Sequence, residues 1–283
     1  MTRPLRIEFP GAFYHVTSRG NKRQNIFTNH EDRNTFVNVL ARTIKTYNWK
    51  CYAFCLMDNH YHILLQTPNG DLSTGMRDLN GIYTQLFNKK HHTTGHIFEG
   101  RYRAFVIEQG EYFCEVLRYT VLNPLRANMV KRPDDWPWSS YSATAYGRKM
   151  YPFVDQKFVL RLFSRTDGLA RERYRAFVQD GVDKRSPFLN VRHGTLLGSD
   201  RFVMEIWNQY SDTEKEPEIN LDERRLARPT LKELFEDTKT KEERNIVINL
   251  ARLRCAYSIT DIAKHLQLNR ATISNILRNQ TSQ

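Results

Sequence analysis

The first half of the chain alternates between two hydrophobic periods, and this alternation constrains the fold more than any other feature. Segments with a period of two that are rich in aromatic and β-branched residues predict strands, and apolar residues at helical spacing predict helices. We expect strands at residues 12–18, 49–57, 60–66 and 101–108, and helices at 31–47, 71–90 and 111–122. The order β-α-β-β-α-β plus a helix predicts an α+β, ferredoxin-like split-βαβ domain with an antiparallel sheet.

The rest of the chain has a different character. A length of 283 residues favours about two domains. We expect the first domain to span residues 1–147, with residues 134–142 wrapping around it, and a helical extension to span 148–210. Residues 211–229 are charged and contain two prolines, which indicates a linker. Residues 230–283 predict an all-α C-terminal region.

The charge balance favours a polyanionic partner. Lys and Arg total 43 against 31 Asp and Glu, which gives a net charge of +12. Such a balance is typical of nucleic-acid-binding proteins, although an ordinary soluble protein can also be basic. The sequence holds neither an apolar run of about 18 residues nor an N-terminal signal core, so we expect a cytoplasmic protein without membrane contact.

The four cysteines do not form a metal-binding or disulfide pattern. Cys51, Cys55, Cys114 and Cys255 contain no CxxC pair, and we expect reduced thiols. Cys51 and Cys55 are four residues apart in an expected strand, so we expect both on one buried face.

His60 and His62 form the first candidate site. Alternate residues of a strand share a face, so the two imidazoles should point the same way, with Tyr61 on the opposite face. Two converging neutral imidazoles are half of a metal site. The alternative is a strand with two polar positions in solvent, but the apolar residues that follow His62 indicate a buried sheet.

Tyr119 and Asn123 form the second candidate site. They lie one turn apart on the expected helix 111–122, which should end at Asn123-Pro124. This spacing presents a phenol and an amide oxygen together, and the amide oxygen could complete a metal site with the histidines. The alternative is a core tyrosine followed by an asparagine that caps the helix.

These residues together resemble a known family. His60-Tyr61-His62, the pair Tyr119 and Asn123, and the stretch Gly100-Arg101-Tyr102-Arg103 are similar to the HUH single-tyrosine transposases. The closer resemblance is to the REP-associated tyrosine transposases of bacteria, over about residues 5–147. The family usually has a bulky hydrophobic residue at the middle position of the triplet, where this chain has Tyr61.

The resemblance implies an activity. His60, His62 and Asn123 would bind Mg²⁺ or Mn²⁺, and Tyr119 would be the nucleophile. The implied enzyme nicks and joins single-stranded or hairpin DNA through a 5′-phosphotyrosine intermediate, as a transposase does. The strand backbone needs cations, and our candidates for phosphate contacts are two clusters on an expected loop and strand: Arg19, Lys22, Arg23, Arg101 and Arg103. Arg101 and Arg103 should share a face of their strand.

The C-terminal segment 258–278 predicts a helix-turn-helix. Ser258 and Asp261 approximate a capping box, and Asn269 should cap the second helix. Polar positions left for DNA are Arg270, Thr272, Ser274, Asn275 and Arg278. An ordinary helical hairpin is the alternative.

Three functions therefore compete. The first is a transposase-like strand-transfer enzyme, which the complete set of histidine pair, tyrosine and asparagine favours. The second is a non-catalytic DNA-binding regulator that uses the helix-turn-helix. The third, a metal hydrolase that activates water, would not need Tyr119. The additional C-terminal half leads us to expect a monomer rather than a dimer.

Overall fold

The computed structural model describes residues 7–210, 230–236, 238, 240–254 and 257–279. The described residues form two compact units. The sheet unit comprises residues 7–184 and 195–210, and the helical unit comprises residues 185–194 and the described residues from 230 onward. The expected linker at 211–229 lies outside the described residues.

A five-stranded sheet with the strand order β2-β3-β1-β4-β5 organises the sheet unit. Its strands are β1 (Ala12–Arg19), β2 (Lys50–Leu56), β3 (His60–Thr67), β4 (Arg103–Ile107) and β5 (Leu196–Leu197). The first four pair antiparallel, and the short β5 pairs parallel with β4. The predicted α+β class and the predicted β-α-β-β-α-β order are therefore confirmed, with β5 as an addition.

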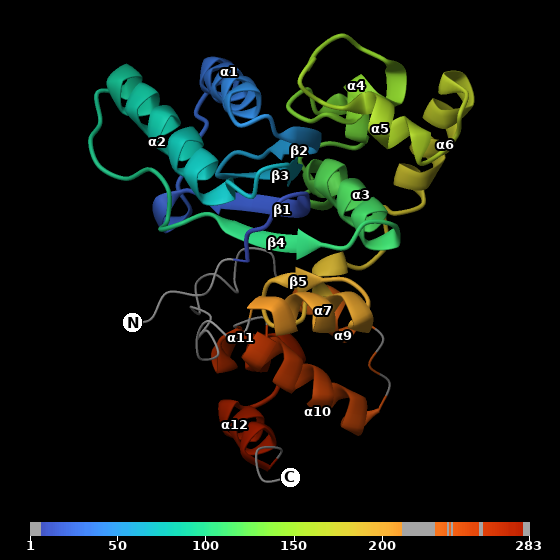
Figure 1. Cartoon of the computed structure of the whole chain (residues 1–283). Coiled ribbons are helices and arrows are strands. Elements are labelled where there is room, and N and C mark those ends of the chain that lie inside the picture. The colour runs from blue at the N-terminus through green and yellow to red at the C-terminus, as the bar shows by residue number, and fades with distance from the viewer. Residues whose placement is uncertain (1–6, 211–229, 237, 239, 255–256, 280–283) are drawn as a thin grey trace. The chain divides into compact units, whose positions relative to one another are not determined.

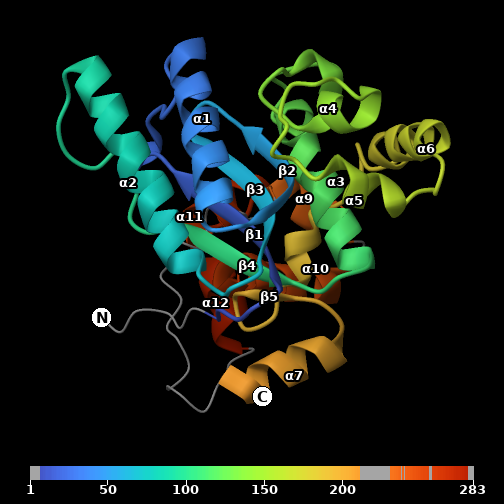
Figure 2. The ribbon, with the colours of Figure 1, turned by 45° about the horizontal axis from the view of Figure 1, so that its top comes forward.

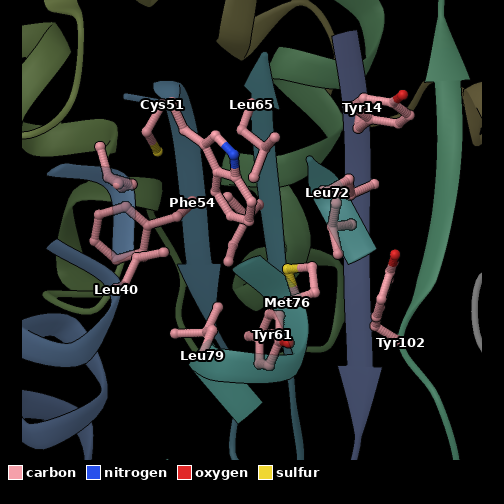
Figure 3. Close-up of a cluster of buried hydrophobic side chains, with 14 of the residues drawn as sticks. Tyr14, Leu40, Cys51, Phe54, Tyr61, Leu65, Leu72, Met76, Leu79 and Tyr102 are labelled. Carbon is pink, nitrogen blue, oxygen red and sulfur yellow. The ribbon is translucent and has the colours of Figure 1, made fainter. Parts of the chain in front are cut away.

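Helices cover both faces of the sheet. The helices α1 (His30–Thr46) and α2 (Leu72–His91) lie on one face and α3 (Glu111–Arg126) lies on the other (Figure 1, Figure 2). The main hydrophobic core fills the space under α1 and α2, and Figure 3 shows part of it, including Phe54, Tyr61, Leu65, Met76 and Leu79. On the other face, Phe113 of α3 packs edge-on against Phe13 of β1, with ring centroids 5.4 Å apart.

A β-bulge in β2 changes the expected placement of two cysteines. Cys51 pairs with Leu65, whereas Cys55 pairs with His62, because the register shifts between Cys51 and Ala53. The extra residue reverses the alternation of side chains, so Cys51 faces the main core and Cys55 faces the side of α3. The expectation of a shared face was wrong. Both thiols are buried and form no disulfide. Cys114 is partly exposed and also forms no disulfide, and Cys255 lies outside the described residues.

The segment after α3 wraps along the edge of β2, as predicted. The Leu56 amide donates to the Trp138 carbonyl at 2.8 Å, and Cys55 and Ser139 form an isolated bridge. The chain then continues through α4 (Tyr141–Tyr146), α5 (Gln156–Arg161), α6 (Asp167–Gln179) and, after β5, α7 (Asp200–Tyr210).

The helical unit has its own hydrophobic core. Its helices are α9 (Leu231–Phe235), α10 (Lys241–Asn249), α11 (Ile259–Leu266) and α12 (Arg270–Asn279). Buried residues that include Leu234, Ile248, Ile262 and Ile273 form this core. Among the described helices of the chain, we find none that is both long and apolar enough to cross a bilayer.

Candidate active site

His60 and His62 lie at the start of β3, on the face of the sheet that α3 covers. Their ring centroids are 4.9 Å apart, as expected for alternate residues of a strand. His62 is 1% exposed, and His60 is partly exposed with its Nδ1 atom 2.7 Å from the side-chain oxygen of Asn59. Opposite them on β1 lie Thr17 and Arg19.

A third imidazole, from His15 of β1, completes this group. Its Nε2 atom lies 3.1 Å from Nδ1 of His62, within hydrogen-bond distance. The sequence analysis did not select His15. It could have been found from the alternation of β1, because His15, Thr17 and Arg19 occupy one face of that strand.

The environment keeps these imidazoles neutral. Burial, and then the charges of Arg103 and His60, lower the pKa of His15 to about 3. Burial, and then the charge of Arg19, lower the pKa of His60 to about 3. Burial also holds the pKa of His62 well below its usual value, with smaller effects from the neighbouring histidines and Arg19. Neutral imidazole is the form that binds metal ions.

One buried nitrogen has the properties of a metal ligand. Nε2 of His62 is buried and lacks a hydrogen-bond partner among the described residues. Such an atom is costly unless something binds it, so it fits a site that takes a metal ion. Within the described ranges, no cluster of three or more His, Cys, Asp or Glu is arranged to hold a metal ion. A site made of two histidines and one asparagine would not count as such a cluster, because asparagine is not one of these four residue types.

Tyr119 of α3 lies next to His62 and His15. Its ring centroid lies 5.9 Å from that of His62 and 6.2 Å from that of His15, both edge-on. The fold therefore brings Tyr119 and His62 together from segments 57 positions apart in the sequence, 62 to 119. The helix α3 buries Phe113, Val116 and Thr120 and contacts β2 and β3, and this packing fixes the position of Tyr119 relative to the sheet.

The expected end of this helix at Asn123-Pro124 was wrong. The helix α3 continues to Arg126 with Pro124 inside it. Pro124 cannot donate to the carbonyl of Thr120, which an ordinary residue at this position would do. The side-chain nitrogen Nδ2 of Asn123 donates to that carbonyl at 3.4 Å and to the carbonyl of Tyr119 at 2.9 Å. This compensation allows the helix to continue, and it leaves Oδ1 of Asn123 as the atom that could bind a metal ion.

The predicted cations divide between the two faces of the sheet. Arg19 lies opposite His60, and the guanidinium of Arg103 lies 4.4 Å from the ring of Phe105 on the histidine side. Arg101 does not share this face, because β4 begins only at Arg103 after a bend at Gly100, which has a φ of +67°. Arg101 instead lines a pocket beside α2.

Lys22 and Arg23 are exposed in the loop after β1. Both have positive φ angles, 51° and 61°, which is unusual for residues other than glycine. The side chain of Asn59 donates to the Arg23 carbonyl at 3.1 Å and fixes this loop beside the start of β3.

Comparison with known proteins identifies this part of the chain. A family model described as "Transposase IS200 like" matches residues 9–120, the segment that carries both histidines and Tyr119. Residues 9–120 of this chain are therefore similar to IS200-like transposases. The family resemblance inferred from the sequence is thereby confirmed.

Individual proteins are also similar to parts of this chain. A protein of Haemophilus influenzae (strain Rd), named as a REP-associated tyrosine transposase, is 27% identical over 121 residues, which cover 38% of this chain and 68% of the relative. The structure of a REP-associated tyrosine transposase bound to a REP hairpin matches 54% of this chain and 90% of its own, with 19% identity and a TM-score of 0.44. A protein from Deinococcus radiodurans R1 described as a transposase matches 47% of this chain and 97% of its own, with 14% identity and a TM-score of 0.31.

Two arginines of α3, one before Tyr119 in the sequence and one after it, attach the helix to the segment around the end of α6. Arg118 is 2% exposed; its guanidinium lies 4.3 Å from the Phe177 ring and donates to the Phe177 carbonyl at 3.1 Å. Arg118 also pairs with Glu115. Arg126 donates to the carbonyl of Gly181 at 3.0 Å, and its guanidinium lies 5.4 Å from the Tyr119 ring. The end of α6 and the turn after it therefore hold the helix that carries Tyr119.

The C-terminal helices adopt the expected local structure. Ser258 and Asp261 form a capping box, and the side chain of Asn269 accepts from the Ala271 amide at 3.1 Å. Gln267, with a φ of 53°, ends α11 before a three-residue connection to α12. Three of the predicted DNA-contacting residues are exposed on α12, namely Arg270, Thr272 and Asn275, while the side chain of Arg278 lies outside the described part.

Proposed function

We propose that this transposase-family chain is a metal-dependent enzyme that cuts and joins single-stranded DNA through a 5′-phosphotyrosine intermediate on Tyr119. The observation that supports this most is the position of the Tyr119 ring, 5.9 Å from that of a neutral, buried histidine whose Nε2 lacks a protein partner in the described structure. A core tyrosine would not require such a neighbour.

In the proposed reaction, the Tyr119 oxygen attacks a backbone phosphorus. The new bond joins the phenol oxygen to phosphorus, the bond from phosphorus to the 3′ oxygen breaks, and the phenolic proton is transferred, directly or through water, to the departing 3′ oxygen. The products are a free 3′-hydroxyl and a strand whose 5′ phosphate is esterified to the protein. A second 3′-hydroxyl can attack this ester and restore the phenol, so joining needs no nucleotide cofactor.

His60, His62 and Asn123 would hold Mg²⁺ or Mn²⁺, which when bound would polarise the scissile phosphate. For Nε2 of His62 to offer a lone pair, its Nδ1 must carry the proton and donate it to Nε2 of His15, 3.1 Å away. His15 would therefore fix the tautomer and orientation of His62. Second-sphere partners of this kind accompany most metal-bound histidines.

Basic side chains near the site would bind the strand backbone. Arg19 and Arg103 lie on the histidine side of the sheet, and Lys22 and Arg23 extend from the loop at its end. We propose hairpin DNA as the natural form of the substrate, and a monomer as the active species. Light scattering of the purified chain with and without DNA measures whether the chain is a monomer.

The C-terminal helices would add a second contact to DNA. In this proposal α11 and α12 form a helix-turn-helix, with Arg270, Thr272 and Asn275 toward the bases and Arg278 near the end of the same helix. If this region alone accounts for DNA binding and no covalent chemistry occurs, the chain is the non-catalytic regulator.

A denaturing gel tests the reaction. The full chain is incubated with a single-stranded hairpin oligonucleotide and Mn²⁺, and we expect a covalent protein–DNA adduct. Tyr119→Phe should abolish the adduct, whereas Tyr112→Phe, on the same helix, should retain it. An adduct that persists in Tyr119→Phe would refute the nucleophile, and one that forms equally well with a chelator would refute the metal requirement.

A further inference from the structure

Asn59 bridges the loop after β1 to His60, the first residue of β3. Its side-chain nitrogen Nδ2 donates to the Arg23 carbonyl at 3.1 Å. Its side-chain oxygen Oδ1 lies 2.7 Å from Nδ1 of His60. A single half-buried amide therefore contacts both a basic loop and a histidine of the candidate active site.

The Arg23 carbonyl fixes the orientation of this amide. A carbonyl oxygen only accepts hydrogen bonds, so the NH₂ group of Asn59 must face it. The amide oxygen then faces His60, and because this oxygen also only accepts, Nδ1 of His60 must carry a proton. The tautomer of His60 thus follows from a backbone carbonyl of the loop.

This tautomer decides which nitrogen of His60 can bind a metal ion. Burial, and then the charge of Arg19, lower the pKa of His60 to about 3, so the ring carries one proton at neutral pH. With that proton on Nδ1, the lone pair is on Nε2. The hydrogen bond made by one ring nitrogen sets the metal-binding role of the other.

The loop that presents the Arg23 carbonyl has a defined conformation. The amides of Arg23 and Gln24 donate to the carbonyls of Gly20 and Asn21, both at 2.9 Å. A Cβ atom at Gly20 would lie 2.0 Å from the Gln24 carbonyl oxygen, so this conformation requires glycine there. The Gly20 amide in turn donates to the Asn59 carbonyl at 2.8 Å. The loop and Asn59 are therefore joined through both main chain and side chain.

The residue before Asn59 holds the other side of this turn. Asp58 pairs with Arg33, which is 8% exposed and whose guanidinium lies 5.6 Å from the Phe27 ring. The Asp58 carbonyl also accepts from the Phe27 amide at 3.1 Å. Because the backbone is held in this way, the Asn59 side chain keeps both of its contacts only while the Arg23 carbonyl stays in place.

We propose that Asn59 is a positioning residue for His60, and that it makes the tautomer of this metal ligand depend on the conformation of loop residues 20–24. The inference rests on the proposed metal site and adds a residue that acts through His60. The loop carries Lys22 and Arg23, the proposed phosphate contacts, so a DNA strand that holds the loop would stabilise the metal-binding form of His60.

Nitrogen NMR of the full chain with labelled histidines measures which nitrogen of His60 carries the proton, and His60→Gln assigns its signals. We expect the proton on Nδ1 in the wild type. Asn59→Leu offers no acceptor, so the proton should shift to Nε2, and the Mn²⁺ dissociation constant, measured by electron paramagnetic resonance, should rise about 10–100-fold. Asn88→Leu is the matched control and should change neither, because Asn88 also donates to a loop carbonyl, that of Gly95 at 2.9 Å.

Asn59→Asp separates the two contacts. A carboxylate still accepts from Nδ1 of His60 but cannot donate to the Arg23 carbonyl, so the proton should stay on Nδ1 whatever the loop does. Gly20→Ala displaces the Gln24 carbonyl and should weaken Mn²⁺ binding in the wild-type background but not in the Asn59→Asp background. An equal loss in both backgrounds would refute the link through the amide.

The role of Asn59 is overturned if His60 of the wild type carries its proton on Nε2, or if Asn59→Leu leaves both the tautomer and the Mn²⁺ affinity unchanged. These measurements require no DNA cleavage. A wild-type chain that shows the Nδ1 proton and its dependence on Asn59 but forms no covalent adduct would refute the proposed chemistry and retain the role of Asn59.

Discussion

Replacing Gly181 with alanine should loosen the helix that carries Tyr119. A Cβ atom at Gly181 would lie 2.1 Å from Cδ and 2.4 Å from Nε of Arg118, closer than atoms can approach. The φ angle of Gly181 is not in the positive range, so alanine meets no backbone strain there. The effect of Gly181→Ala must therefore come from displacement of the buried Arg118.

The magnitude follows from the contacts that Arg118 would lose. Its hydrogen bond to the Phe177 carbonyl, made by a charged donor, is worth about 1.5–3 kcal/mol. Its contact with the Phe177 ring is worth about 0.5–2 kcal/mol. The lower chain entropy of alanine in the unfolded state offsets roughly 0.4–1 kcal/mol. We expect the free energy of unfolding to fall by roughly 2–4 kcal/mol.

Urea unfolding of four proteins measures this effect: wild type, Gly181→Ala, Arg118→Ala and the double variant. In the Arg118→Ala background, Gly181→Ala should cost less than about 0.5 kcal/mol, because the clash is absent. Gly168→Ala is the matched control on α6, since a Cβ there would meet nothing within 4 Å. An equal cost of Gly181→Ala in both backgrounds would refute the reasoning.

Three further predictions concern the histidines and α2. His15→Phe should raise the Mn²⁺ concentration needed for half-maximal adduct formation about 10–100-fold, since His62 loses its second-sphere partner; an unchanged requirement would contradict this role. The pKa of His15 is about 3 in the folded chain, so the unfolded chain binds its proton first as the pH falls below about 6.5. Stability should therefore decline by up to about 1.4 kcal/mol per pH unit from this residue between pH 6.5 and 3, and urea unfolding of His15→Phe should show a shallower decline. Gly75→Ala should destabilise the sheet unit, because its Cβ would lie 2.2 Å from Cζ2 of Trp49, while Gly81→Ala on the same helix should not; equal melting temperatures would refute this.

The sequence predicts the sheet well because its strands alternate clearly. The pairing of His60 with His62 needs only the two-residue period of a strand, and α1 and α2 follow from their apolar positions. The bulge at Cys51 and Ala53 was not predictable, because one extra residue leaves the composition of the strand unchanged. The proximity of Tyr119 to His62 depends on how α3 packs against the sheet, and the spacing of residues in the sequence does not predict this packing.

The continuation of α3 beyond Pro124 shows a second limit. Proline after asparagine normally indicates a helix end, and this rule failed because the side chain of Asn123 takes over hydrogen bonds within its own helix. His15 was missed for a related reason. A single histidine in a strand carries no pattern, and its contact with His62 is visible only when β1 and β3 are paired.

Mass spectrometry of the trapped adduct tests the central claim most directly. After reaction with the hairpin oligonucleotide, nuclease and trypsin digestion should yield the peptide 119–126, whose single tyrosine is Tyr119, with the mass of an added nucleotide 5′-phosphate. Fragmentation should place that mass on Tyr119 and leave the 3′ end of the released strand as a hydroxyl. A nucleotide on any other residue, or cleavage without a nucleotide on the protein, would contradict the account.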